Sequence, residues 1–179
     1  MIVAIDRCRA VPLLPFLQTL FDIALLRKGP EHIPRSVVIL LMAITLWLFS
    51  ALAALALIDR FDEADFFLEI FSALIAVACY SAVVVLARQG PRLTQTISAI
   101  IGCGALLTLV FVVAYALLRP FIGAGLMTLV AWSILLWSVS VKGHIIASAI
   151  NRHWYIGMTI AVTVFVLQSI IGVLVSSEP

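Results

Sequence analysis

Five long apolar runs separated by short loops constrain the fold of this chain more than any other feature of its sequence. A helix of roughly 20 apolar residues crosses the roughly 30 Å of hydrocarbon in a bilayer. None of the runs shows the alternating pattern of a barrel strand, so each is expected to be a helix with its backbone hydrogen-bonded internally. The chain is therefore predicted to be an all-α, polytopic membrane protein, a five-helix transmembrane bundle with spans at 36–58, 66–87, 95–118, 123–141 and 155–175.

The composition agrees with a bilayer as the main surroundings. Apolar residues make up 64% of the chain and charged residues 11%, whereas soluble domains average about 45–50% and 25%. The net charge is only +2, so there is no electrostatic reason to expect a nucleic-acid partner.

Lysine and arginine fall unevenly on the two sides of the predicted bundle, and cytoplasmic loops are the ones enriched in both. One side holds only Arg60 and Arg119, and its first loop, 59–65, is acidic. The amino terminus is therefore predicted to be cytoplasmic and the carboxyl terminus outside, in a multi-pass protein of a bacterial inner (plasma) membrane. Residues 1–10 lack the apolar core of a cleavable signal, so the first span is expected to act as the signal. The basic side holds nine cations: Arg7, Arg9, Arg27, Lys28, Arg35, Arg88, Arg92, Lys142 and Arg152.

Residues 1–35 form a cytoplasmic segment ahead of the transmembrane domain, 36–179. The i, i+3, i+4 spacing of its apolar residues predicts a short amphipathic helix, ended by a Gly-Pro pair at 29–30. At about 14 residues the helix is too short to span a bilayer. Two interpretations stay open: a face that docks a cytosolic partner, or a helix that lies on the bilayer surface. The predicted apolar face consists of Leu13, Phe16, Leu17, Leu20, Phe21 and Ala24.

The connector between this helix and the first span is expected to be stiff, because Pro30 and Pro34 hold the residues before them extended. It ends in Ser36, which is placed to cap the first span. His32 stands alone in this turn and is not expected to bind a metal or to sense pH.

Ionisable groups at membrane depth are functional hypotheses by default. Glu69 is expected close to the outer surface, and Arg119, at the outer end of the third span, is its candidate partner. Lys142 and His144 follow the fourth span and are placed at the cytoplasmic boundary, where Lys142 reaches the headgroups. About 20 Å or more of depth separates Glu69 from Lys142, so no proton relay joins them. Lys142, His144 and Arg152 belong to a basic rim that contacts lipid headgroups.

Small residues four apart mark places where helix backbones approach one another or a second copy of the chain, so a homo-oligomer is compatible with the sequence. Gln168, well inside the fifth span, is expected to hydrogen-bond across a helix interface, because an unpaired amide in hydrocarbon costs roughly 4–8 kcal/mol. The small pairs are Ser50 and Ala54, Ser72 and Ala76, Ser98 and Gly102, and Gly157 and Ala161.

The sequence contains no pattern typical of catalysis: no HExxH, no GxSxG, no phosphate-binding glycine loop and no paired carboxylates within a span. The three cysteines are too scattered for a disulfide framework or a metal site. We therefore expect no enzyme activity and no cofactor. The alternative to a partner-binding protein is a small transport or channel subunit, whose path would be lined by polar residues such as Thr45, Tyr80, Thr108 and Tyr115.

The organisation resembles the membrane domain of the Yip (Ypt-interacting protein) family, including its bacterial relatives. The likeness covers 34–175 and rests on five closely spaced helices after a cytoplasmic segment, and on the stretch WSILLWSVSVKGH at 132–144. The resemblance implies a non-enzymatic protein that binds or organises membrane or protein partners, which in the eukaryotic members are small GTPases and trafficking factors. Besides the lipid bilayer, we expect a membrane or cytosolic protein as partner.

Overall fold

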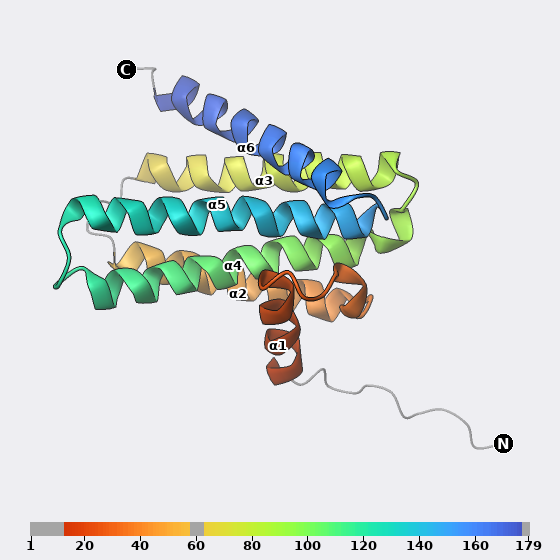
Figure 1. Ribbon diagram of the computed structural model, residues 1–179, viewed down its shortest axis with the longest axis horizontal. Helices are drawn as coiled ribbons and strands as arrows, with labels where there is room; N and C mark the ends of the chain where they lie inside the picture. The colour runs from red at the N-terminus through yellow and green to blue at the C-terminus, as the bar shows by residue number, and fades with distance from the viewer. Residues whose placement is uncertain (1–12, 58–62, 177–179) are drawn as a thin grey trace.

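The computed structural model describes residues 13–57 and 63–176, which fold as helices joined by short turns (Figure 1). Four stretches are long and apolar enough to cross a membrane: Val37–Leu57, Gly90–Leu118, Gly125–Ala149 and Trp154–Leu174. The described residues therefore form the all-helical, multi-pass membrane bundle that was predicted. In chain order the elements are α1 (Leu13–Ala24), the 3-10 helix η1 (Pro30–His32), α2 (Val37–Leu57), α3 (Glu63–Leu86), the 3-10 helix η2 (Gly90–Arg92), α4 (Leu93–Leu118), α5 (Ala124–Ala149) and α6 (Trp154–Ser176).

The observed helices follow the predicted spans closely except at the end of α5. This helix continues to Ala149, well beyond the predicted end at 141. The stretch 142–153 contains no proline that would stop it. Asn151, in the left-handed conformation with φ 52°, forms the turn that ends it instead. Lys142 and His144 therefore lie within α5, which corrects their predicted placement beyond the span.

The long helices lie roughly side by side, and α1 runs across them (Figure 1). α4 packs against α1, α2, α3 and α5, and it is the helix with the most buried residues. Many of those residues are small, including Ser98, Gly102 and Cys103. Small side chains let neighbouring backbones approach, so α4 can occupy the centre of the bundle.

α5 and α6 approach one another through glycine. A Cβ atom added at Gly157 of α6 would lie 2.2 Å from the backbone oxygen of Gly143 and 2.7 Å from the backbone nitrogen of Ala147. A Cβ atom added at Gly143 would lie 3.0 Å from the Cα of Met158. Ala161, one turn after Gly157, is buried. The predicted small pair at 157 and 161 therefore marks a contact within this chain.

Two polar side chains make hydrogen bonds that the sequence predicted, one between helices and one at a helix end. Gln168 joins α6 to α3, because its Nε2 donates to the backbone oxygen of Ser72 at 3.0 Å and to the Ser72 hydroxyl at 2.8 Å. Ser36 caps α2, since its Oγ accepts a hydrogen bond from the Val38 backbone N–H at 3.2 Å. Both predictions are confirmed.

Large apolar side chains cover the outside of the bundle. Leu52 of α2, Leu129 of α5 and Val173 of α6 are all more than half exposed, and similar residues line each of these helices. Soluble monomers rarely expose contiguous apolar patches of more than a few hundred Å². Lipid chains are the surroundings that suit such a surface.

Candidate functional site at the basic end

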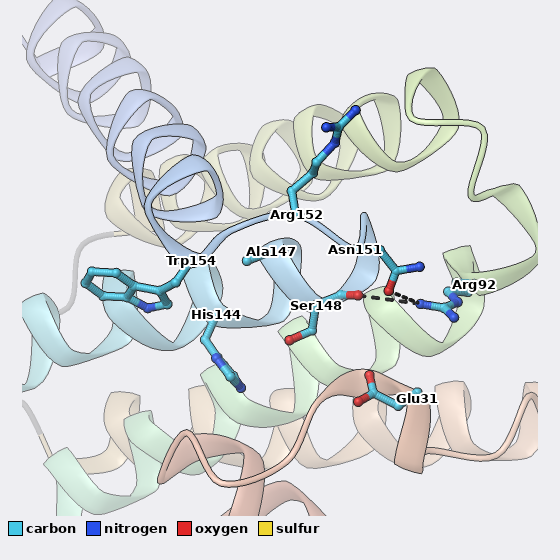
Figure 2. A pocket seen from close by; sticks show the side chains of 8 residues that line it. All are labelled: Glu31, Arg92, His144, Ala147, Ser148, Asn151, Arg152 and Trp154. Carbon is cyan, nitrogen blue, oxygen red and sulfur yellow. Dashed lines mark hydrogen bonds between the residues drawn. The ribbon is translucent and has the colours of Figure 1, made fainter.

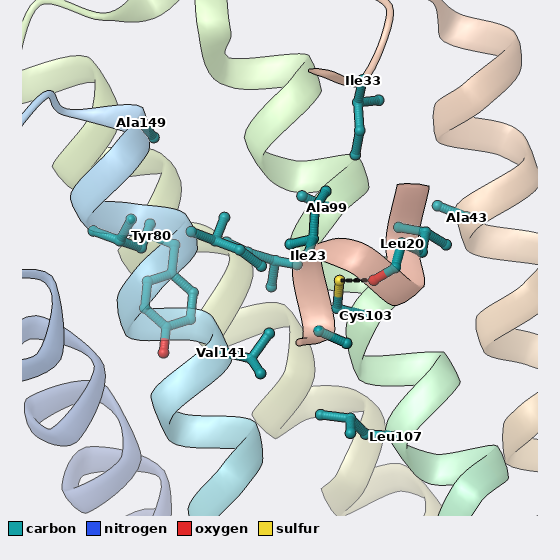
Figure 3. Packing of buried hydrophobic residues seen from close by; sticks show 14 of the residues in the cluster. Leu20, Ile23, Ile33, Ala43, Tyr80, Ala99, Cys103, Leu107, Val141 and Ala149 are labelled. Carbon is teal, nitrogen blue, oxygen red and sulfur yellow. Dashed lines mark hydrogen bonds between the residues drawn. The ribbon is translucent and has the colours of Figure 1, made fainter. Parts of the chain in front are cut away.

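α1 packs an apolar face into the bundle of its own chain (Figure 3). Leu20 and Ile23 are fully buried, and Phe16 is almost so. A Cβ atom added at Gly102 of α4 would lie 2.8 Å from the Cδ2 of Leu20, so Leu20 fills the notch that the glycine leaves. The next residue, Cys103, donates its S–H to the Leu20 carbonyl at 3.6 Å. Leu20 therefore contacts α4, and its side chain is not exposed to a partner.

The buried face of α1 is rotated from the predicted one. Phe21, which was predicted to belong to it, is 52% exposed, and Ile23 is buried in its place. Leu17 is half-buried and lines an open hollow beside α1 together with Asp22 and Lys28. The Nζ of Lys28 lies 2.7 Å from Oδ2 of Asp22, and this hydrogen bond lowers the pKa of the Asp22 carboxyl below its ordinary value. α1 thus has an inward apolar face and a mixed outward face.

α1 ends before the predicted Gly-Pro pair. Leu26 takes the left-handed conformation, with φ 61°. Its N–H donates to the carbonyl of Ile23, and the N–H of Arg27 donates to the carbonyl of Asp22, both at 2.9 Å. These two bonds form a Schellman motif, which closes a helix by satisfying carbonyls of its last turn.

Two side chains of α5 form hydrogen bonds to backbone carbonyls at the end of α1 and in the connector after it. The indole Nε1 of Trp137 donates to the Ala24 carbonyl at 3.0 Å. The Nε2 of His144 lies 3.2 Å from the Lys28 carbonyl, to which its N–H form donates. Trp137 and His144 are seven residues apart, so they lie on the same face of the helix. His144, predicted as a rim residue, therefore also anchors the N-terminal segment.

Gln95 ties the connector to the first turn of α4. Its Nε2 donates to the backbone oxygen of Ile33, and its Oε1 accepts a hydrogen bond from Nε of Arg35 at 3.2 Å. Gln95 and Ile33 are both buried. The connector between α1 and α2 is therefore held at the Lys28 and Ile33 carbonyls. Gly29 and Ile33, which precede Pro30 and Pro34, are extended as predicted.

A polar hollow opens at the end of the bundle where α4 and α6 begin and α5 ends (Figure 2). We call this the basic end, because it carries Arg35, Arg88, Arg92 and Arg152. The hollow has a volume of about 490 Å³. Its lining residues come from the connector and from three helix ends: Glu31, Arg92, His144, Ala147, Ser148, Asn151, Arg152 and Trp154.

The remaining predicted residues lie elsewhere. Lys142 is half-buried on α5, about 10 Å before the helix ends at ~1.5 Å per residue, and does not line the hollow. It forms no ion pair with the side chains that the structure describes. The side chain of Glu69 lies outside the described residues, so its pairing with Arg119 stays a prediction. The guanidinium carbon of Arg119 lies 5.2 Å from the ring centroid of Tyr115, a favourable cation–π distance.

Of the eight lining residues, only His144 was a predicted site residue, and Arg152 was predicted only as part of the basic rim. The other six were missed: Glu31, Arg92, Ala147, Ser148, Asn151 and Trp154. They come from three segments far apart in the sequence, namely η1, η2 and the end of α5 with the turn into α6, so no single linear motif contains them all. The available signal was their shared position on the side predicted to be cytoplasmic. Among the residues described, no three His, Cys, Asp or Glu side chains come together in a way that could hold a metal ion.

Comparison with known proteins adds no relative: no family model, curated protein or solved structure matches this chain. The function is therefore argued from the geometry of the chain itself.

Proposed function

We propose that this chain is a five-span integral membrane protein of Yip type that binds or organises membrane or protein partners at its basic end and catalyses no reaction. In this proposal the amino terminus and the basic end face the cytoplasm of a bacterial cell, and the carboxyl terminus lies outside. In this proposal α3, the second span in chain order, crosses the membrane together with α2, α4, α5 and α6, which makes five spans. Its 24 residues extend about 36 Å at ~1.5 Å per residue, and it packs against α4, α5 and α6.

One observation carries the proposal: the cations of separate turns gather at one end of the bundle, around a polar hollow. Arg35 and Arg92 are both hydrogen-bonded there, to Gln95 and to Asn151, so these cations are held by the fold. Positive charge concentrates on the cytoplasmic side of membrane proteins, where it also attracts anionic headgroups. A surface built in this way favours contact with other membrane components.

Three of the four polar residues expected of a transport path are bonded within their own helix or buried in the apolar core. The Thr45 hydroxyl donates to the Met42 carbonyl and the Thr108 hydroxyl to the Gly104 carbonyl, so each is bonded within its own helix. Tyr80 is buried in the apolar core. These contacts support partner binding over the alternative of a transport or channel subunit.

Matched single cysteines test the orientation. Gly90 lies at the basic end and Gly123 at the other, and a Cβ atom added at either would meet no atom within 4 Å. In a variant without Cys8, Cys79 and Cys103, Gly123→Cys should react with an impermeant thiol reagent in spheroplasts, and Gly90→Cys only after the membrane is opened. The reverse pattern would overturn the orientation.

Photo-crosslinking from the same two positions tests partner binding. A crosslinking amino acid at Gly90 should give a discrete adduct with one protein or lipid in native membranes, and the same amino acid at Gly123 should give none. Equal adducts from both positions, or none from Gly90 in a normally abundant protein, would contradict binding at the basic end.

A further inference from the structure

α1 crosses the long helices at a level well inside the bundle (Figure 1). Arg92 ties the start of α4 to the end of α5 by hydrogen bonds, so depth along both helices can be measured from the basic end. Leu20 packs at Gly102, nine residues after α4 begins, which is about 14 Å from that end at ~1.5 Å per residue. The Ala24 carbonyl is bonded to Trp137, twelve residues before α5 ends, or about 18 Å. Both helices therefore place α1 at the level of their middle turns.

The connector rises from this depth to the basic end. The Lys28 carbonyl is bonded to His144, five residues before α5 ends, which is about 8 Å from the basic end at ~1.5 Å per residue. The Ile33 carbonyl is bonded to Gln95, in the first turn of α4. The chain therefore climbs about one long-helix turn after another between α1 and α2, and α1 is the deepest part of it.

Exposed apolar side chains occur closer to the basic end than α1 does. Val37 and Val38, in the first turn of α2, are 68% and 58% exposed, and Leu86, at the end of α3, is 82% exposed. Arg35 is bonded to Gln95 near the start of α4, so α2 begins close to the basic end. Because exposed apolar surface of this kind suits hydrocarbon rather than water, the hydrocarbon layer begins nearer to the basic end than α1 lies.

The exposed side of α1 carries an apolar stripe. Leu14 is 68% exposed, Phe21 is 52% exposed and Leu25, in the turn after α1, is 37% exposed. Together with the half-buried Leu17 they follow the i, i+3, i+7, i+11 spacing of a single helix edge. We call these four residues the outer stripe. It adds apolar surface at a level where the neighbouring helices are also apolar on the outside.

Two of the three polar side chains of α1 are bonded within the chain. The Thr19 hydroxyl donates to the Pro15 carbonyl at 2.8 Å. Asp22, the one charged residue in α1, lies 2.7 Å from the Nζ of Lys28. Ionisable groups at membrane depth pair with one another in this way, and a lysine stem can extend toward the headgroups. The third polar side chain, Gln18, is exposed. α1 therefore carries few groups that hydrocarbon would disfavour.

We propose that α1 is embedded in the leaflet at the basic end, with its outer stripe in contact with lipid acyl chains. The outer stripe continues the exposed apolar surface of the long helices, and lipid chains suit that surface. A helix that lies parallel to the membrane with its apolar side in the acyl region is a known way of anchoring a protein in one leaflet. The inference rests on the proposed function in one respect, that the long helices cross a bilayer, and it holds for either orientation.

Spin labels on single cysteines test this inference with the full chain in vesicles of phosphatidylcholine and phosphatidylglycerol. Oxygen concentrates in hydrocarbon and a nickel chelate stays in water, so the ratio of their accessibilities reports depth. In the cysteine-free variant, the oxygen-to-nickel ratio at Phe21→Cys should be about tenfold above that at Gly90→Cys, the equivalent of ~1.4 kcal/mol of partition free energy. Leu48→Cys, 46% exposed and eleven residues after α2 begins, is the lipid-facing control at a similar depth.

Each other outcome of this measurement would overturn the proposal. A ratio at Phe21 equal to that at Gly90 would place the outer stripe in water and would favour a docking face for a cytosolic protein. Low accessibility to both reagents would mean that protein, such as a second copy of the chain, covers the stripe. Leu14→Cys, on the same stripe, provides a second reading if Phe21→Cys folds poorly.

Substitution of Phe21 tests the same contact without a label. Phe21→Glu should accelerate hydrogen exchange in α1 about tenfold, the equivalent of ~1.4 kcal/mol, because a carboxylate at this depth draws α1 toward the headgroups. Phe21→Leu keeps an apolar side chain and is the matched control. If the side chain faced water, the two substitutions would change exchange in α1 to the same small extent, and that result would contradict embedding.

Failure of this inference is separable from failure of the proposed function. The oxygen-to-nickel ratio reports depth from either side of the membrane, whereas the cysteine labels at Gly90 and Gly123 report orientation. Water at Phe21, with hydrocarbon at Leu48 and the expected labelling, would remove the embedded helix alone. Water at Leu48 would show instead that the long helices do not cross the bilayer.

Discussion

Two glycine contacts hold this molecule together in different ways. Between α5 and α6, Gly157 faces backbone atoms of Gly143 and Ala147, which cannot move without shifting the whole helix. Between α4 and α1, Gly102 faces the end of the Leu20 side chain, which has other rotamers available. We therefore expect the contact between α5 and α6 to be rigid. We expect the contact between α4 and α1 to give way more easily, so that α1 can loosen while the long helices stay packed. The predictions that follow test this difference, from the largest expected effect to the smallest.

Gly157→Ala should be the most damaging of these changes, lowering the free energy of unfolding by about 3 kcal/mol, the upper end of typical overpacking costs. The added methyl group would lie 2.2 Å from the Gly143 oxygen, so the two helices must separate. Unfolding in mixed detergent micelles gives the measurement. Gly172→Ala on the same helix meets open space and is the control. Equal effects at 157 and 172 would mean that α5 and α6 are not in such close contact.

Gly102→Ala should cost less, about 1–2 kcal/mol within the same overpacking range, because Leu20 can partly move away. Gly104→Ala, two residues further along α4 and without a close neighbour, is the matched control. In the double variant with Leu20→Ala the losses should be less than additive, since contacting residues couple by about 0.5–3 kcal/mol. Additive losses would show that Leu20 does not occupy the notch in the membrane protein.

Trp137→Phe should lower the free energy that keeps α1 packed on the bundle by about 1 kcal/mol, the net value of a typical hydrogen bond. It removes the donor to the Ala24 carbonyl and keeps most of the ring. Hydrogen exchange in residues 25–33 should accelerate while α5 and α6 keep their protection. Trp132→Phe, exposed on the same helix, should change neither quantity. Faster exchange throughout the bundle would contradict the expectation that α1 can loosen while the other helices stay packed.

Gln168→Met should have the smallest effect, about 0.6 kcal/mol, the average for hydrogen bonds between transmembrane helices. The amide joins α6 to Ser72 of α3. The variant therefore tests whether α6 is kept in place mainly by these hydrogen bonds or by its close contact with α5 at Gly157. Ser169→Ala removes a hydroxyl that is bonded within its own helix and is the control. A loss in the free energy of unfolding as large as that of Gly157→Ala would mean that α6 is kept in place mainly by its hydrogen bonds to Ser72.

The sequence predicted contacts that local chemistry demands and missed those that depend on helix rotation. Gln168 was predicted to find a partner because hydrocarbon offers an amide none, and the partner is Ser72. The face of α1 was assigned from spacing alone, and Ile23 rather than Phe21 proved to be buried. α1 has apolar residues on more than one side, so only the shape of its seat could select between them.

Apolar length and the placement of lysine and arginine determined that the described residues form a multi-pass helical bundle with Arg35, Arg88, Arg92 and Arg152 at one end. Each of those properties resides in a continuous stretch of sequence, because a span must satisfy its own backbone in lipid. Only the tertiary structure decided that α1 packs on its own bundle, that α5 extends past Lys142 and that Glu31, Arg92 and Arg152 line one hollow. Those outcomes depend on which helices meet and at what rotation, and pairings of residues more than 50 positions apart leave no periodic trace in a single sequence.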